Sequence, residues 1–154
     1  MSKIEVGRKA PPFTLEGPEG PWSLKDAAGS NVVIYFYPRD NTPGCTQEGA
    51  DFAAANGQFK KLKTLIRGIS PDSVASHVKF KAKMGFPFEI LSDPEQAVCK
   101  LYDVIRMKSM YGKKYLGMER STFLIDAAGL LRQEWRKVKV NGHTESVLAA
   151  VKAL

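Results

Sequence analysis

The sequence contains few of the residues that hold a metal or cross-link a small fold. It has two cysteines, Cys45 and Cys99, and two histidines, His77 and His143. The cysteines are too few and too far apart for a disulfide framework, a Cys-x-x-Cys pair or a zinc-binding spacing. Because the histidines are also distant from each other and from both cysteines, we expect no metal site and expect both histidines on the solvated surface.

Long hydrophobic runs are also missing. The first residues, Met1 to Val6, lack the apolar segment of a signal peptide, and the longest apolar run is far too short to cross a bilayer. We therefore expect a cytoplasmic protein with no membrane partner. The chain has no low-complexity tract or internal repeat, so we expect one domain with one core over residues 1–154.

Acidic residues are outnumbered by basic ones, and the net charge is +7. Such a charge permits nucleic-acid binding, and Lys60, Lys61, Lys63 and Arg67 could form the basic face of one helix. The sequence has no RNA-binding aromatic signature and no helix-turn-helix pattern, so we do not expect nucleic acid as the main partner. We interpret the charge as a solvated surface that also attracts acidic protein partners.

The chain alternates between apolar strand patterns and helical patterns. The run 32–37 is apolar, β-branched and aromatic without polar alternation, which predicts a strand buried on both faces. The strand over 32–37 comes after a Pro- and Gly-rich lead and is followed by a helix over 42–63 that Gly57 bends or divides. The patterns then predict a strand over 65–70, a helix from Pro71-Asp72 to Met84 closed by Gly85, and a short strand over 88–91. A helix from Asp93 to about Tyr102, a hairpin of strands over 120–125 and 130–135, and a last helix over 144–154 complete the order. This order predicts an α/β fold with a mixed central β-sheet flanked by helices.

One thiol falls where a helix should begin. Pro38 ends the strand over 32–37, Thr42 suits an N-cap, and Pro43 suits the first helical position. Cys45 therefore lies in the first helical turn, where free backbone amides and the helix dipole favour a thiolate. The position also follows the carboxyl end of a strand, where such sheets bind ligands. From these residues alone, Cys45 is either a nucleophile or an inert buried thiol.

The pattern around Cys45 extends to distant parts of the chain. It comprises Val33-Ile34-Tyr35-Phe36-Tyr37-Pro38, Thr42-Pro43-Gly44-Cys45-Thr46 with Glu48, Ser92-Asp93, Met110-Tyr111-Gly112-Lys113, and the segment from Glu119 to Asp126. In these segments the chain resembles the peroxiredoxins, and within them the bacterioferritin comigratory protein group, also called peroxiredoxin Q. The resemblance runs from about Val6 to the C-terminus, and its Pro-x-x-x-Thr-x-x-Cys core is highly specific because the required residue types follow a strand at the right spacing.

The resemblance implies a thioredoxin-like fold and thiol-dependent reduction of hydroperoxides without metal, haem or another cofactor. Cys45, as a thiolate, is expected to attack the terminal oxygen of a hydroperoxide and become a sulfenic acid. The hydroxyl of Thr42 is expected to hydrogen-bond both the sulfur and the peroxide. Arg120 is expected beside the sulfur, where it favours the thiolate and stabilises charge on the peroxide oxygens. Considered alone, Thr42 is a helix cap and Arg120 a surface cation.

Three further residues have supporting tasks under the same resemblance. Pro38 has no polar side chain and no N–H, so it is expected to shield the sulfur from water. The backbone amides of Gly44 and Cys45 are expected to add hydrogen-bond donors. Glu48 is expected to hold Arg120 in place through an ion pair.

The chain departs from the group in its second thiol. Many members carry a resolving cysteine five residues after the nucleophile, where this chain has Ala50, and others carry it in the next helix, where Lys81 stands. Cys99 is the only other thiol, and its apolar neighbours predict a buried small residue. A disulfide between Cys45 and Cys99 needs Cα atoms within about 7 Å, and hence local unfolding. We expect a one-cysteine cycle in which an external thiol, thioredoxin or glutathione with glutaredoxin, reduces the sulfenic acid; a cycle resolved by Cys99 is the alternative.

Two other functions share features of this sequence. A thioredoxin-type disulfide reductase has the same fold but needs a second thiol about two residues from the first, and Gln47 and Glu48 offer none. A redox sensor or basic nucleic-acid-binding domain would use oxidation of Cys45 only to change a partner surface. The resemblance favours the peroxidase and suggests a monomer.

Overall fold

The structure is a computed structural model that describes residues 4–154. Met1 to Lys3, part of the segment that lacks a signal-peptide pattern, lie outside the described residues. Seven strands form the central sheet: β1 (Thr14–Gly17), β2 (Gly20–Ser23), β3 (Asn31–Phe36), β4 (Thr64–Ser70), β5 (Glu89–Ser92), β8 (Ser121–Ile125) and β9 (Leu131–Trp135).

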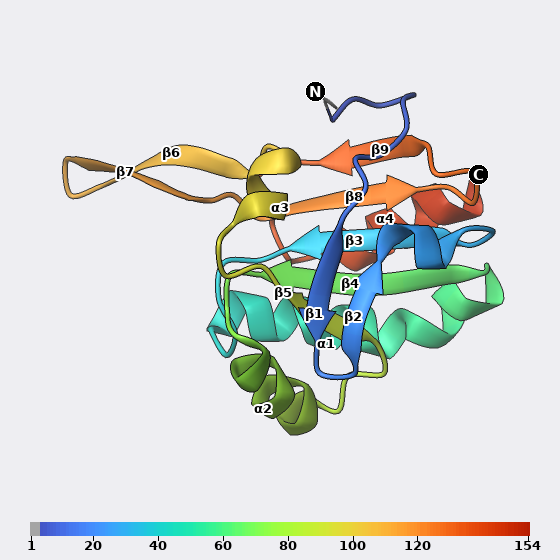
Figure 1. Ribbon diagram of the computed structural model, residues 1–154, viewed down its shortest axis with the longest axis horizontal. Helices are drawn as coiled ribbons and strands as arrows, with labels where there is room; N and C mark the ends of the chain where they lie inside the picture. Colours follow the sequence, from blue (N-terminus) through green and yellow to red (C-terminus); the bar gives the residue numbers. More distant parts are fainter. Residues whose placement is uncertain (1–3) are drawn as a thin grey trace.

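The sheet is mixed and has the strand order β2-β1-β5-β4-β3-β8-β9 (Figure 1). β3, β4 and β5 are parallel neighbours at its centre. β8 and β9 on one side, and β1 and β2 on the other, run antiparallel to their neighbours. The carboxyl ends of the three parallel strands therefore lie at one edge of the sheet, as the strand-helix order predicts.

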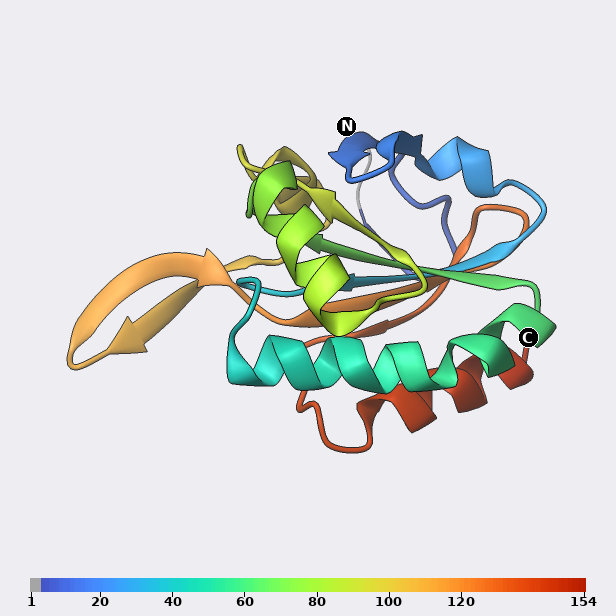
Figure 2. The ribbon, with the colours of Figure 1, turned by 90° about the horizontal axis from the view of Figure 1, so that it is seen from below.

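Helices cover both faces of the sheet. They are η1 (Leu24–Ala27), α1 (Pro43–Lys61), α2 (Val74–Met84), α3 (Ala97–Leu101) and α4 (His143–Lys152). α1 and α4 lie side by side on one face, while η1 and α3 lie on the other (Figure 2). α2 packs against β5. The predicted mixed sheet with helices on both sides is confirmed.

Two hydrophobic clusters fill the space between the sheet and these helices. Successive residues of a strand point to opposite faces, and β3 divides in this way. Val32, Ile34 and Phe36 belong to the cluster that contains Cys99, whereas Val33 and Tyr35 belong to the cluster that contains Cys45. The two thiols therefore lie on opposite faces of the sheet.

Most predicted elements are present, with corrected ends. α1 runs unbroken through Gly57. α2 begins at Val74 rather than at Pro71-Asp72, because the side chain of Ser73 caps it by accepting a hydrogen bond from the Ser76 amide at 3.1 Å. Gly85 ends α2 with a φ of 66°, as predicted.

Two predictions about helices are wrong. The helix expected from Asp93 to Tyr102 contains only the five residues of α3. The four cations expected on one helix face, Lys60, Lys61, Lys63 and Arg67, do not share a helix, because α1 ends at Lys61 and Arg67 lies on β4. The guanidinium carbon of Arg67 instead lies 4.9 Å from the centre of the Trp22 ring. No helix in residues 4–154 has the length and apolar character needed to cross a membrane.

The structure adds two hairpins that the sequence patterns did not predict. β1 and β2 pair around a turn in the Gly- and Pro-rich lead. β6 (Ile105–Met110) and β7 (Lys113–Met118) form a separate two-stranded sheet that projects from the body of the molecule (Figure 1). We call β6 and β7 with their turn the ribbon.

Candidate active site

Cys45 is positioned by the junction between β3 and α1. Thr42 occupies the N-cap in an extended conformation, and Pro43 is the first helical residue, as predicted. Cys45 is then the third residue of the helix. The amides of Gly44 and Cys45 belong to the first helical turn, whose N–H groups have no partner within the helix. The sulfur therefore lies beside free N–H dipoles at the carboxyl end of β3.

Arg120 reaches the sulfur because β8 pairs with β3. In their antiparallel register Phe36 is opposite Ser121, so Arg120 lies next to the end of β3, where the chain turns toward α1. Its Nη2 donates a hydrogen bond to Cys45 Sγ at 3.4 Å. Two residues that are 75 positions apart in sequence are thus brought into contact.

The structure also brings Glu48 to Arg120. Arg120 Nη1 donates to Glu48 Oε1 at 2.6 Å, and Glu48 is only 1% exposed. Burial raises the pKa of Glu48 to about 7, against the opposing pull of Arg120. Burial lowers the pKa of Arg120, but Glu48 and Cys45 outweigh this effect and raise it overall. The guanidinium is therefore held positive between a carboxyl and a sulfur.

Gly44 makes the approach of the guanidinium possible. A Cβ atom at this position would lie 3.0 Å from Arg120 Nη2, tighter than an ordinary contact. Gly44 is therefore needed for space rather than for an unusual backbone angle. The backbone at Gly44 thus lies close against the guanidinium of Arg120.

Thr42 and Pro38 were both expected to act at the sulfur. The Thr42 hydroxyl donates to the carbonyl oxygen of Arg39 at 3.0 Å and makes no helix-capping bond. The expected hydrogen bond from Thr42 to the sulfur is absent among the described residues. Pro38 is exposed at the end of β3. The roles of both residues toward a bound peroxide remain predictions.

Solvent access to the sulfur is narrow. Cys45 is 2% exposed, and the side chain of Arg120 is 16% exposed. Thr42 and Gly44 are half-buried. A small ligand therefore meets the guanidinium and the helix amides at the point where it reaches the sulfur.

Cys99 has a different environment. It is buried on α3, and its backbone N–H donates to Asp93 Oδ2 at 2.8 Å. Burial, with a further contribution from Asp93, raises the pKa of the Cys99 thiol well above its ordinary value. The prediction of a buried small residue is confirmed, and the neutral thiol is a poor nucleophile in this conformation.

The expectation that both histidines lie on the surface is wrong. His77 is 0% exposed, because its Nδ1 lies 2.7 Å from Asp40 Oδ2 and its Nε2 lies 2.9 Å from the carbonyl oxygen of Leu91. The ring of His77 is thus held between a carboxylate oxygen and a backbone carbonyl oxygen, one at each nitrogen. Burial opposes ionisation of Asp40, but hydrogen bonds from His77, Tyr37 and Ser76 lower its pKa overall. Asp40 lies in the loop before Cys45, so the pair fixes this loop to α2 and β5.

His143 is the second misplaced histidine. It is buried at the start of α4, and its Nε2 lies 2.8 Å from the hydroxyl of Thr122 on β8. Burial, with the nearby charge of Arg120, lowers the pKa of His143 to about 4, so the imidazole is neutral at pH 7. The sequence signal that could have placed it was its position at the start of an amphipathic helix pattern.

These contacts define what the site can do. A thiolate beside a cation and free amides suits nucleophilic attack that leaves a negative oxygen behind. No group of three or more metal-ligating side chains occurs within residues 4–154. The thiol, the guanidinium and the helix amides that meet at Cys45 point to thiol chemistry.

Comparison with known proteins gives consistent relatives. The AhpC/TSA family matches residues 6–134. The peroxiredoxin Bcp of Xanthomonas campestris is 55% identical over 131 residues, which are 85% of this chain and 82% of that protein. A solved structure of the bacterioferritin comigratory protein of Xanthomonas campestris, described for its alkyl peroxide reduction activity, has a TM-score of 0.90 at 48% identity and covers 97% of this chain and 98% of its own.

A more distant structure has a similar fold. It is a yeast mitochondrial 1-Cys peroxiredoxin, described for a thiol resolving mechanism through glutathione and thioredoxin systems. Its TM-score is 0.84 at 25% identity, and the match covers 97% of this chain and 76% of that chain.

Proposed function

The chain belongs to the AhpC/TSA family, and from this premise we propose that Cys45 is its peroxidatic nucleophile. Within the family it is a thiol peroxidase of the peroxiredoxin Bcp group, also called peroxiredoxin Q, and it has a thioredoxin-like fold. The observation that carries the proposal is the contact of 3.4 Å between Arg120 Nη2 and Cys45 Sγ at the start of α1. Substrates are hydrogen peroxide and organic hydroperoxides; alkyl peroxides are named for the Xanthomonas relative.

The reaction is a single displacement at oxygen. An electron pair of the Cys45 thiolate forms an S–O bond to the terminal peroxide oxygen, and the O–O bond breaks. The other oxygen leaves as hydroxide or alkoxide, takes a proton and departs as water or an alcohol, while Cys45 becomes a sulfenic acid. Arg120 and the amides of Gly44 and Cys45 stabilise the charge that develops on the oxygens.

Glu48 acts through Arg120. Its ion pair at 2.6 Å holds the guanidinium between the helix and the sulfur. Thr42 is assigned to the incoming peroxide, which requires its hydroxyl to turn away from the Arg39 carbonyl. Pro38, exposed just after β3, is assigned to limiting water at the sulfur.

The cycle uses one cysteine. Cys99 and Cys45 lie in clusters on opposite faces of the sheet, so a bond between them requires the chain to unfold around one of them. Ala50 and Lys81 occupy the two places where the group usually has a resolving thiol. The sulfenic acid is then reduced by an external thiol, and the yeast relative is described with glutathione and thioredoxin systems. A cycle resolved by Cys99 remains the alternative.

We also propose that the protein is a monomer, that residues 1–154 form one domain, and that the reaction needs no cofactor. A reducing compartment such as the cytoplasm suits its two free cysteines.

Intact mass after one equivalent of peroxide distinguishes the two cycles. A one-cysteine cycle adds one oxygen atom to the protein. A disulfide between Cys45 and Cys99 instead removes two hydrogens, and this result would refute the one-cysteine cycle.

Two cysteine variants locate the chemistry. Cys45→Ser should abolish peroxide consumption, because it removes the nucleophile. Cys99→Ser should retain most of it, because Cys99 is buried on the opposite face. Peroxide consumption by Cys45→Ser at the wild-type rate would remove Cys45 from the mechanism.

A further inference from the structure

The ribbon offers surface that its own packing does not use. β6 and β7 pair with each other from Ile105 opposite Met118 at the base to Met110 opposite Lys113 at the tip. Five residue steps along a strand span roughly 17 Å. An isolated pair of strands is only marginally stable in water. A ribbon of this length is therefore suited to being covered by another molecule.

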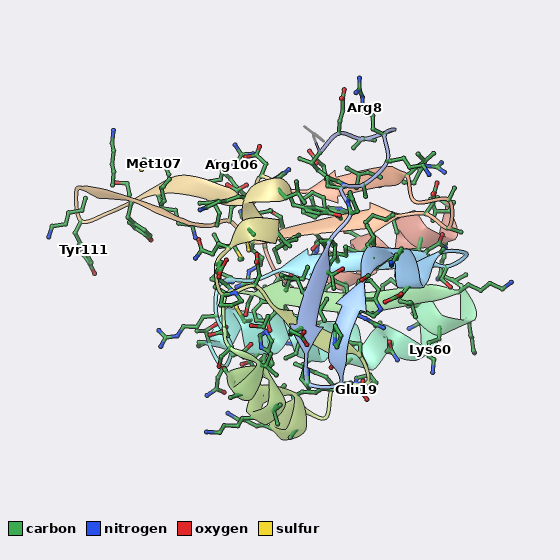
Figure 3. The ribbon with its side chains drawn as sticks, viewed as in Figure 1. Arg8, Glu19, Lys60, Arg106, Met107 and Tyr111 are labelled. Carbon is green, nitrogen blue, oxygen red and sulfur yellow. The ribbon has the colours of Figure 1, made fainter. Side chains whose placement is uncertain are left out.

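One face of the ribbon carries apolar side chains beyond the core. Met107 is opposite Leu116, so their side chains share a face with those of Ile105 and Met118 at the base. The base pair packs against the core, but Met107 is 62% exposed and Leu116 is 69% exposed. Tyr111 at the tip is 97% exposed, and Figure 3 shows Met107 and Tyr111 away from the body of the molecule. Tyrosine and methionine are enriched at protein interfaces.

The charges on the ribbon have a single sign. Residues 105–118 include Arg106, Lys108, Lys113 and Lys114, and no aspartate or glutamate. Arg106 pairs with Asp103, while the three lysines form no ion pair with any residue that the structure describes. A second copy of this chain, with a net charge of +7, would meet like charge here. A partner with an acidic surface would be attracted.

The base of the ribbon lies next to the active site. Met118 ends β7, and Arg120, two residues later, contacts the sulfur. A groove of about 460 Å³ at the base is lined by Arg106, Met107, Glu119, Arg136 and Lys137. The ribbon projects from the end of the molecule where α1 begins, whereas Lys60 lies toward the other end of α1 (Figures 1 and 3). A molecule held on the ribbon is therefore adjacent to Cys45.

We propose that the ribbon docks an acidic protein dithiol that reduces oxidised Cys45. The inference rests on the proposed function, because it assigns a surface to the external reductant of the one-cysteine cycle. Cys45 is 2% exposed, so a protein thiol must be held beside it until the sulfenic acid becomes accessible. The apolar face supplies the contact, and the lysines steer and orient the partner.

The reduction proceeds in two thiol steps. The first partner thiol attacks the sulfenic acid sulfur, forming a mixed disulfide with Cys45 and releasing water. The second partner thiol attacks the partner's own sulfur in that disulfide, which releases the Cys45 thiol and leaves the partner oxidised. The docked dithiol supplies both electrons, so no further reductant is needed.

The test compares two variants with equal net charge. The ribbon variant is Lys108→Glu, Lys113→Glu and Lys114→Glu. The control variant is Lys60→Glu, Lys61→Glu and Lys63→Glu, at the far end of α1. Each set lowers the net charge by six, from +7 to +1. A third variant, Met107→Ser with Leu116→Ser, changes the apolar face without changing charge.

Three rates are measured for each protein: oxidation of Cys45 by peroxide, turnover with glutathione, and turnover with a thioredoxin that is net negative at pH 7. The ribbon variant should lose about tenfold or more in kcat/KM for this thioredoxin at low salt, with a smaller loss at high salt. The apolar variant should show a loss that does not depend on salt. The ribbon variant and the apolar variant should both keep the wild-type rate of Cys45 oxidation and the wild-type turnover with glutathione. These unchanged rates would also show that the two variants are folded.

Several results would overturn the inference. Equal thioredoxin turnover by the ribbon and control variants would remove the ribbon from docking. Turnover of the wild type with glutathione but never with the thioredoxin would exclude a protein dithiol. If the ribbon variant loses a salt-sensitive binding to duplex DNA that the wild type has, while its turnover with thioredoxin is unchanged, the ribbon binds nucleic acid and not a protein dithiol. Failure of the wild type to consume peroxide with any thiol would instead reject the proposed function itself.

Discussion

We assign Arg120 both a structural role toward Glu48 and a proposed catalytic role toward the peroxide, and a pair of substitutions can separate them. Within the described residues, Arg120 is the one hydrogen-bond partner of Glu48 Oε1, and Glu48 Oε2 has none; Arg120→Met therefore leaves the carboxyl without a partner there. Breaking a buried ion pair in this way costs about 3–5 kcal/mol of unfolding free energy. The same substitution removes a donor from the sulfur, which should slow peroxide reaction by about 10²–10³-fold.

The loss of stability should depend on pH through Glu48. Burial raises the pKa of this carboxyl from 4.5 to about 7, which corresponds to roughly 3 kcal/mol. A carboxyl with a raised pKa binds its proton more tightly in the folded than in the unfolded state, so the folded state loses stability as pH rises from 4.5 through the folded value. Arg120 opposes this rise, so Arg120→Met should raise the pKa further. The variant should therefore be close to wild type at pH 5 and weakest at pH 8.

Urea unfolding at both pH values and single-turnover peroxide consumption measure the two roles. Glu48→Gln added to Arg120→Met removes the buried charge, so the double variant should regain most of the stability at pH 8. Its reaction with peroxide should stay slow, because the guanidinium is still missing. Recovery of the rate together with the stability would show that Arg120 acts only by supporting the fold, and equal stability of Arg120→Met at both pH values would refute the role given to Glu48.

Two further predictions concern packing and pH. Gly49→Ala should lower the free energy of unfolding by about 1–3 kcal/mol, because its Cβ would overlap Cζ of the buried Phe86 ring. The control Gly57→Ala, whose Cβ would have no atom within 4 Å, should gain up to about 1 kcal/mol in urea unfolding, and equal stability of the two variants would contradict the role of this packing. His143 should contribute a loss of up to roughly 3 kcal/mol as the pH falls from 6.5 to 4, because the unfolded chain binds a proton there while the folded pKa is about 4. Glu48 changes the stability in the opposite direction over this range, so the measured quantity is the difference between the wild type and His143→Gln, which should shift against the wild type as the pH falls; equal pH slopes for the two proteins would rule out this contribution of His143.

Local sequence determined the junction that carries Cys45. The unbroken apolar run of β3, the extended N-cap at Thr42 and the proline at position 43 are read from neighbours in the chain. Helix starts and buried strands depend on backbone preference and periodicity, which act over a few residues. For this reason the position of the thiol at a helix N-terminus follows from the sequence, although the start of α2 depended on a cap at Ser73 that the pattern did not reveal.

The long-range contacts were decided by tertiary structure. Burial of His77 required Asp40, which is 37 residues away, and an isolated histidine in the sequence gives no sign of such a partner. The ribbon was not predicted because β7 (Lys113–Met118) has no regular alternation of apolar and polar residues, and its strands have no buried face along most of their length. Arg120 was named by family resemblance, but its contact with Cys45 depends on the register that sets Phe36 opposite Ser121.

The sequence by itself therefore determined that Cys45 begins a helix after a buried strand, and family resemblance named it as the candidate nucleophile. Only the folded chain decided that Cys45 and Cys99 lie on opposite faces of the sheet, that Glu48 is buried against Arg120, and that the ribbon stands beside the site. The physical reason is that helix starts are fixed by contacts between near neighbours. The environment of a buried charge or thiol depends instead on which strands become adjacent, and that is set by pairing between distant segments.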